Sequence, residues 1–247
     1  MLKRIVADLH IHTVLSPCAE YRMVPTLIVE RARQVGLGLI GVTDHNSGEN
    51  ARAVMDAAEG TGVRVLPGME VESREGVHIL TLFDDLDGLE RWQATVYAAL
   101  PNRENDERVF GTQLVVDAAG RLVGVNRRLL IAATDLTLEE VVARVGALEG
   151  LCVPAHIDRP ANGLLSVLGL VPEGLEVPAL EISPLHTPTE ALARFPGIAG
   201  YALLRSSDAH ALEDVGKAAT PLLMAAASTT EVAMACRGEA GRRVIHE

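Results

Sequence analysis

The chain has 247 residues, 48% of them hydrophobic and only 3% aromatic, and its formal net charge is −11. This length and hydrophobic fraction describe a well-cored globular protein and exclude a disordered chain. The acidic balance disfavours an extended nucleic-acid-binding surface, although it leaves room for a nucleotide or a single-strand end held at a metal centre.

The apolar runs are strand-sized and broken by Gly, Pro or charged residues, so we expect no membrane-spanning helix and no membrane partner. The first residues enter a strand pattern at once and lack the long apolar region of a signal peptide. The three cysteines, an odd number without the spacing of a secreted scaffold, indicate free thiols. These features predict a cytoplasmic protein.

Strand and helix patterns alternate in the first part of the chain. Strands are expected at 4–7, 37–42, 63–68 and 76–83, and helices at 25–36, 50–60 and 86–100. Pro25 in a first helical turn and Gly36 at its end are typical helix boundaries. Repeated strand–helix units predict an α/β fold built on a parallel sheet or a barrel.

The alternation stops between about residues 101 and 135, where the segment 113–125 resembles a hairpin of two apolar runs around a Gly-containing turn. It resumes with a helix at 138–148 and strands at 150–156, 179–184 and 200–210, and a last strand and helix are expected after Gly216. We interpret residues 1–247 as a single domain with an insertion at about 101–135.

Histidines and carboxylates recur at the carboxyl ends of the predicted strands, where α/β barrels and open parallel sheets carry their active sites. The residues placed in this way are His10, His12, His45, Glu70, His156, Asp208 and His210, whereas His78 begins its strand. One such histidine is usually a core or surface residue, but so many at equivalent positions indicate a shared site.

Imidazole and carboxylate are ligands of Zn²⁺, Mn²⁺ and Fe²⁺, and burying such a cluster without a cation is costly. Several ions that share ligands hold a hydroxide at neutral pH and clamp phosphoryl oxygens. The sequence therefore predicts a site at which two or more divalent ions (Zn, Mn or Fe) share ligands.

Four segments resemble the motifs of the PHP (polymerase and histidinol phosphatase) family: DLHIHT at 8–13, TDHN at 43–46, PAHIDRP at 154–160 and SDAH at 207–210. The resemblance implies a distorted (β/α)₇ barrel, TIM-like, and phosphoesterase activity. It also implies two or three such ions and hydrolysis of a phosphate ester by a metal-bound hydroxide at this multinuclear site. It implies a first metal bound by His10, His12, Glu70 and Asp208, a second bound by Glu70, His78 and His156, and a third bound by His45 and His210. Asp208 and His210 are also expected to take part in catalysis.

Cys18 stands where many relatives of this family have a histidine ligand of the third metal, six residues after His12. A thiolate ligand would favour Zn²⁺ or Fe²⁺ over Mn²⁺ or Mg²⁺. The alternatives are that the third site is empty or redox-sensitive. Because LSPCAEY resembles a PHP subgroup with a Ser-Pro-Cys signature, we interpret Cys18 as a ligand.

Asp8 and Asp44 are interpreted as acceptors for the free ring nitrogens of ligand histidines, and Asp44 equally well as a turn or capping residue. Arg159 is interpreted as a clamp for a substrate phosphate, with an exposed ion pair as the alternative. His186 is expected in a loop and His246 on the surface.

The expected substrate is a small phosphorylated metabolite, a nucleotide or an oligonucleotide end. One competing hypothesis is a non-catalytic metal-binding or regulatory PHP module. Another is an amidohydrolase-like C–N hydrolase, which also begins with His-x-His but expects a bridging lysine in a middle strand. No lysine lies between Lys3 and Lys217, which disfavours that version.

Overall fold

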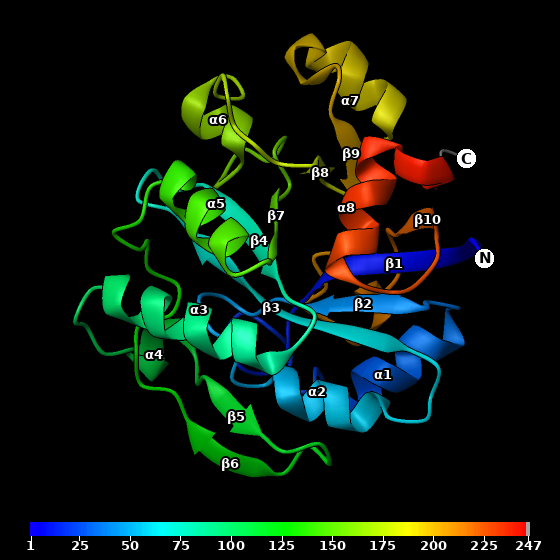
Figure 1. Cartoon of the computed structure of the whole chain (residues 1–247). Coiled ribbons are helices and arrows are strands. Elements are labelled where there is room, and N and C mark those ends of the chain that lie inside the picture. The colour runs from blue at the N-terminus through cyan, green and yellow to red at the C-terminus, as the bar shows by residue number, and fades with distance from the viewer. Residues whose placement is uncertain (246–247) are drawn as a thin grey trace.

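The computed structural model describes residues 1–245 (Figure 1), so His246 lies outside the described residues. The strands are β1 (Lys3–Ile11), β2 (Leu39–Val42), β3 (Arg64–Glu72), β4 (His78–Leu82), β5 (Leu114–Val116), β6 (Leu122–Val125), β7 (Leu151–Pro154), β8 (Ala179–Ile182), β9 (Ala202–Arg205), β10 (Thr220–Met224) and β11 (Arg243–Val244). The helices are α1 (Pro25–Gln34), α2 (Ala51–Ala58), α3 (Leu86–Ala99), α4 (Glu107–Phe110), α5 (Leu138–Ala147), α6 (Leu164–Leu168), α7 (Pro188–Arg194) and α8 (Thr229–Arg237).

The main sheet has the strand order β11-β10-β1-β2-β3-β4-β7, and β8 pairs with β9 in a separate two-stranded sheet. The segment after β9 returns to β1 through a parallel bridge between Ala209 and Ile11, which curls the strands into a distorted barrel. The prediction of an α/β fold with a distorted TIM-like barrel is therefore confirmed.

The sheet is mixed: of the expected parallel sheet or barrel, the barrel is present, but β4 and β10 run antiparallel to their neighbours. β1, β2 and β3 run parallel, but β4 is antiparallel to both β3 and β7, and β10 is antiparallel to β1. The connection 73–77 between β3 and β4 is too short for the crossover that two parallel strands need. A turn of this length therefore reverses the chain direction.

Three apolar layers hold the barrel together. Its interior is filled by strand residues such as Leu9, Leu66 and Val153, together with Val232 of α8. One outer layer packs α1 and α2 against the sheet, and the other packs α3 and α5 against it. Figure 1 shows α1 and α2 on one side of β1–β3 and α8 on the other.

Among the described residues, none of the helices has the length and apolar character that crossing a membrane requires.

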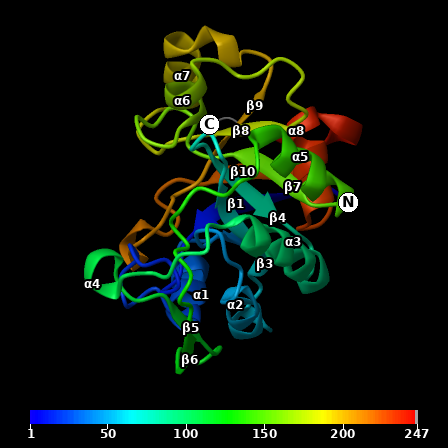
Figure 2. The same cartoon turned by 90° about the vertical axis from the view of Figure 1, so that its left-hand side faces the viewer.

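The expected hairpin in the segment 113–125 is present as β5 and β6, which pair antiparallel with Leu114 opposite Val125. It lies at the lower end of the molecule in both Figure 1 and Figure 2. Asn46 Nδ2 donates to the carbonyl oxygen of Leu130 at 2.7 Å, and Asn50 Oδ1 accepts from the backbone N–H of Val116 at 2.9 Å. The polar residues after β2 thus anchor this segment to the barrel.

The end of the described chain is held to α8 by a two-pronged ion pair. Glu231 accepts from Nε and Nη2 of Arg242, both at 2.7 Å, and from the backbone N–H of Ala225. The hydrogen bonds from Arg242 lower the pKa of Glu231 from 4.5 to about 2. The pair therefore stabilises the folded state when the carboxylate is ionised.

We predict that Glu231→Gln lowers the free energy of unfolding at pH 7 by about 1–2 kcal/mol, since it removes charge-assisted hydrogen bonds. The pKa is lower in the folded state, so this contribution is complete above pH 4.5 and disappears as the pH falls towards 2. Urea titrations of both proteins at pH 7 and pH 3 measure the difference. Glu239→Gln, in a more exposed pair with Arg237, is the control and should change stability far less. An equal loss in both variants would contradict the prediction.

Candidate metal centre

The residues that the sequence singled out as metal ligands come together at the carboxyl edge of the barrel, around the carboxylate of Glu70. Glu70 Oε1 accepts from Nδ1 of His78 at 2.8 Å and from Nε2 of His156 at 3.0 Å. Glu70 Oε2 lies 3.0 Å from Nδ1 of His45. Glu70 is 1% exposed, so this carboxylate is screened from water by the rings that surround it.

His78 reaches this cluster although it begins its strand. In the antiparallel pairing of β3 and β4, His78 lies opposite Glu72, at the carboxyl end of β3. The start of β4 therefore lies at the same edge of the sheet as the ends of the parallel strands. This reversal explains the single exception to the strand-end pattern.

Asp208 lies beside the two histidines of β1 and the loop that follows it. Its Oδ1 is 3.3 Å from Nε2 of His10 and 3.2 Å from Nε2 of His12. The ring of His210 stacks on the ring of His12 with 4.0 Å between centroids. Three groups of donor atoms lie close enough together to hold a metal ion: His10, His12 and Asp208; His45, Glu70 and His78; and His12, His45 and His210.

Two hydrogen bonds orient the rings of His10 and His12. Nδ1 of His10 donates to Oε1 of Glu181 at 2.9 Å, and Nδ1 of His12 donates to Oγ of Ser16 at 2.8 Å. The Ser16 hydroxyl in turn donates to Oδ1 of Asp44 at 2.7 Å. Both Nδ1 atoms therefore carry a proton, and both Nε2 atoms point into the centre of the cluster.

The chemistry of these donors fits a cation. The Nε2 atoms of His10 and His12 are only 3.1 Å apart, so their lone pairs repel each other unless a positive charge lies between them. Burial alone would lower the pKa of His10, but the carboxylates of Asp208, Glu181 and Glu70 raise it well above its ordinary value. Burial and the nearby His210 lower the pKa of His12 well below its ordinary value. A proton on His10 thus supplies a charge that a bound metal ion can replace.

Cys18 lies at the exposed rim of the cluster, with its Sγ 3.4 Å from Nε2 of His45. Partial desolvation opposes ionisation of the thiol, but hydrogen bonds with His210 and His45 outweigh it and lower the pKa of Cys18 to about 6. A thiolate beside two imidazoles is a good ligand for a soft divalent ion.

The interpretation of Asp8 as a partner of a histidine ring needs correction. Its fully buried carboxylate accepts from the backbone N–H groups of Ser207 and Gly216, both at 2.9 Å. The side chain faces the segment after β9 and ties the amides of Ser207 and Gly216 to β1. Asp44 does act on a ring, but through Ser16 rather than directly.

Arg159 forms an ion pair in this structure. Its Nη1 lies 2.5 Å from Oδ2 of Asp208, and its side chain is 42% exposed. His186 donates from Nδ1 to the buried Asp158 at 2.6 Å, so it has a defined partner although it lies in a loop. Arg159 therefore lies at the edge of the cluster, paired with one of the predicted ligands.

Sequence reasoning missed Glu181 and Ser16 as parts of the site. Glu181 carried a usable signal, because it is a carboxylate inside the apolar strand segment ALEISP. It is 2% exposed and reaches the same cluster as the predicted ligands. Ser16 carried none beyond its place beside Cys18, since serines are common in loops.

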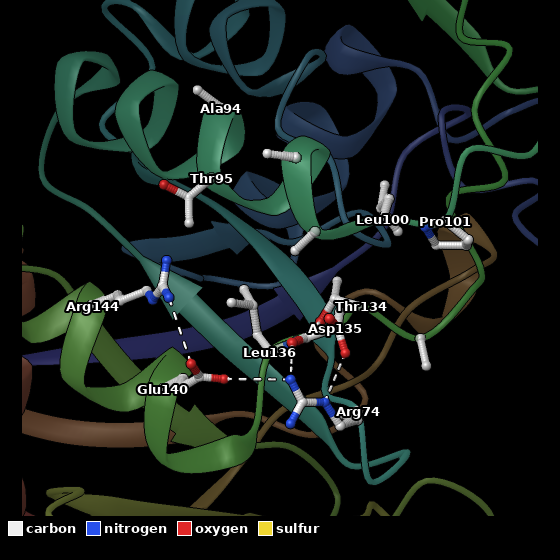
Figure 3. Close-up of a pocket in the computed structure, with 13 residues that line it drawn as sticks. Arg74, Ala94, Thr95, Leu100, Pro101, Thr134, Asp135, Leu136, Glu140 and Arg144 are labelled. Atoms are coloured by element: carbon white, nitrogen blue, oxygen red, sulfur yellow. Dashed lines mark hydrogen bonds and ion pairs between the residues drawn. The ribbon is translucent and has the colours of Figure 1, made fainter.

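A large open cavity of about 970 Å³ lies away from this centre, between α3 and α5 (Figure 3). Arg74 bonds to Asp135 at its wall, and Glu140 lies 3.6 Å from Arg144. None of the predicted ligands lines this cavity. Its charged groups are already paired with one another, which is typical of a solvated groove.

Fold and site together define an α/β barrel protein with a buried histidine–carboxylate cluster at the carboxyl ends of its strands. The PHP domain model matches residues 8–158, more than half of the chain. The chain therefore belongs to the PHP domain family.

Individual relatives are distant. The uncharacterized protein YqxK of Bacillus subtilis (strain 168) is 25% identical over 99% of this chain, which spans 65% of that protein. The lesion-specific endonuclease PfuEndoQ from Pyrococcus furiosus superposes with a TM-score of 0.68 at 20% identity, over 98% of this chain and 58% of the endonuclease. A candidate metal-dependent phosphoesterase from Bifidobacterium adolescentis superposes with a TM-score of 0.57 at 21% identity, over 83% of this chain and 87% of that protein. These likenesses show the shared fold, and this chain spans under two thirds of the first two proteins.

We predict that Zn²⁺ or Mn²⁺ raises the melting temperature by about 5–10 °C when present at about 100 times its Kd, because binding adds about 2.7 kcal/mol to the stability of the folded state. Differential scanning fluorimetry of chelator-treated protein measures this shift, and EDTA should reverse it. His10→Ala should lose most of the shift. An equal shift in wild type and variant would place the binding elsewhere.

Proposed function

We propose that the chain hydrolyses a phosphate ester at this centre with the help of two or three divalent ions. The observation that carries the proposal is the convergence of His10 and His12 with two carboxylates on one buried point. Membership of the PHP family supports metal-dependent hydrolysis in general. The ester, the number of ions and the metals are the parts that we infer.

The proposed ligands of the ions are His10, His12, Cys18, His45, Glu70, His78, His156, Asp208 and His210. Bound divalent ions would lower the pKa of a water molecule and neutralise charge on the phosphoryl oxygens. Glu70, in contact with His10, His45, His78 and His156, is the natural bridging ligand. Zn²⁺ and Fe²⁺ suit this imidazole-rich set best, with Mn²⁺ as the third candidate.

The remaining polar groups at the edge suit the substrate. We propose that Arg159 leaves Asp208 when a phosphate arrives, because its planar guanidinium can donate two parallel hydrogen bonds to phosphoryl oxygens. An acid or a water molecule beside the ions is the proposed proton donor to the leaving oxygen, and Asp208 and His210 are the proposed catalytic residues at the partly exposed rim. Asp208 holds the rings of His10 and His12 while this happens.

A nucleotide or an oligonucleotide end is a reasonable substrate class beside small phosphorylated metabolites. The similar fold of a lesion-specific endonuclease favours testing nucleic acids, while the net charge of −11 favours a small substrate. A non-catalytic metal-binding module remains the alternative from another class. It predicts metal binding without turnover of any phosphomonoester, phosphodiester or C–N substrate.

We predict that Asp208→Asn or His10→Ala lowers kcat/KM for ester hydrolysis by about 10³-fold or more, because each change removes several kcal/mol of electrostatic stabilisation from the transition state. The measurement is kcat/KM on a panel that contains a phosphomonoester, a phosphodiester and a short oligonucleotide. Circular dichroism checks the fold of each variant. Asp214→Asn, in an exposed pair with Lys217, is the control and should keep full activity. Full activity of His10→Ala on any of these esters would show that this centre does not catalyse their hydrolysis.

We predict that Cys18→Ser lowers the affinity for Zn²⁺ by about tenfold or more and changes that for Mn²⁺ little, because a thiolate prefers the softer ion. Calorimetric titrations with each metal compare the two proteins. Cys236→Ser, far along the chain in α8, is the matched control. Equal Zn²⁺ affinities in wild type and Cys18→Ser would remove Cys18 from the ligand set.

A further inference from the structure

Glu181 is a buried carboxylate in a strand of apolar residues. Its neighbours Leu180 and Ile182 are fully buried, and Glu181 itself is 2% exposed. Burying a carboxylate costs free energy unless hydrogen bonds or charges compensate it. The groups that approach Glu181 therefore indicate what it does at this position.

Two of the proposed ligands depend on this one side chain. Oε1 of Glu181 accepts from Nδ1 of His10 at 2.9 Å and from the backbone N–H of His156 at 3.1 Å. The backbone carbonyl of Glu181 also accepts from the N–H of Ile157 at 2.9 Å. Glu181 thus holds the ring of His10 and the backbone that carries His156.

The hydrogen bonds between Glu181 and residues 156 and 157 matter because the backbone of His156 is strained. His156 has a φ of +28°, a region that residues other than glycine rarely adopt. Such a conformation persists only when its surroundings stabilise it, and the two hydrogen bonds from residues 156 and 157 to Glu181 do so. This backbone turn directs the ring of His156 to Glu70.

We propose that Glu181 is a positioning residue that couples two metal ions of the centre. The proposal rests on the ligand set of the proposed function, in which His10 and His156 bind different ions. Loss of the Glu181 side chain frees the His10 ring and the backbone N–H of His156 together, while the backbone bond from Ile157 to residue 181 remains. Both ions should then bind more weakly, although Glu181 is not one of the proposed ligands.

Glu72 provides a matched comparison, because its Oε2 approaches a single proposed ligand ring, Nε2 of His78, at 3.6 Å. A carboxylate that supports one ring should affect one ion only. Outer hydrogen-bond partners of metal ligands change affinity by about 10–100-fold when removed. Removal of Glu181 should therefore weaken the binding of two ions, and removal of Glu72 the binding of no more than one.

The test is calorimetric titration of the chelator-treated full chain with Zn²⁺ alone. We expect Glu181→Ala to weaken two binding events by about 10–100-fold each. Glu72→Gln should weaken one at most, because Glu72 lies beyond hydrogen-bond distance of His78. Glu181→Gln keeps an oxygen that can accept from His10 and His156, and should restore part of both affinities. Should Glu181→Ala fail to fold, Glu181→Gln and Glu72→Gln carry the comparison, with two weakened events against one at most.

A readout without metal separates this proposal from the proposed function. At a pH where His10 is neutral, ring ¹⁵N NMR of the metal-free protein should show its proton at Nδ1 in the wild type and a mixture of tautomers in Glu181→Ala. Unchanged tautomers and affinities, or only one weakened event, would contradict the coupling while leaving the proposed function intact. A wild type that binds none of Zn²⁺, Mn²⁺ and Fe²⁺ would contradict both.

Discussion

The structure depends on a requirement for positive charge among the buried side chains at the carboxyl edge of its barrel. His10, His12, Glu70 and Asp208 are buried or nearly so, and their polar atoms converge from the ends of different strands. Such a set is costly in a low dielectric unless a cation or a proton lies among the donors. Because the Nε2 atoms of His10 and His12 face each other, the positive charge is needed close to these two atoms. Burial of the site, the orientation of its rings and the chemistry proposed for it all follow from it.

Hydrogen bonds from a second set of groups fix the orientation of the rings and of the backbone in this site. Glu181 and the pair of Ser16 and Asp44 keep the protons of His10 and His12 on the outer ring nitrogens. The positive φ values of His156 and Asp208 turn both side chains inward, at a cost that the surrounding hydrogen bonds offset. Two of the non-glycine residues with positive φ are therefore proposed ligands, and backbone strain of this kind is common at functional sites.

The helices and strands show which features of the fold follow from the local sequence and which do not. Patterns of apolar residues correctly predicted α3, α5 and the β5–β6 hairpin to within a few residues, because local spacing and turn chemistry determine these elements. They did not predict that β4 runs antiparallel, since strand direction depends on pairing between distant segments. The polar run after β2 is also divided by long-range contacts: His45 faces the cluster, whereas Asn46 and Asn50 hold the inserted segment.

The sequence by itself determined the fold class and the residues that meet at the barrel edge, because histidines and carboxylates at strand ends are a local signal with a simple geometric consequence. Only the tertiary structure decided which group orients which. It assigned Asp8 to backbone amides, joined Asp44 to His12 through Ser16, and brought Glu181 to His10 across 171 positions of the chain. The physical reason is that a hydrogen bond requires a donor and an acceptor within about 3 Å, and the spacing along a sequence contains no such distance.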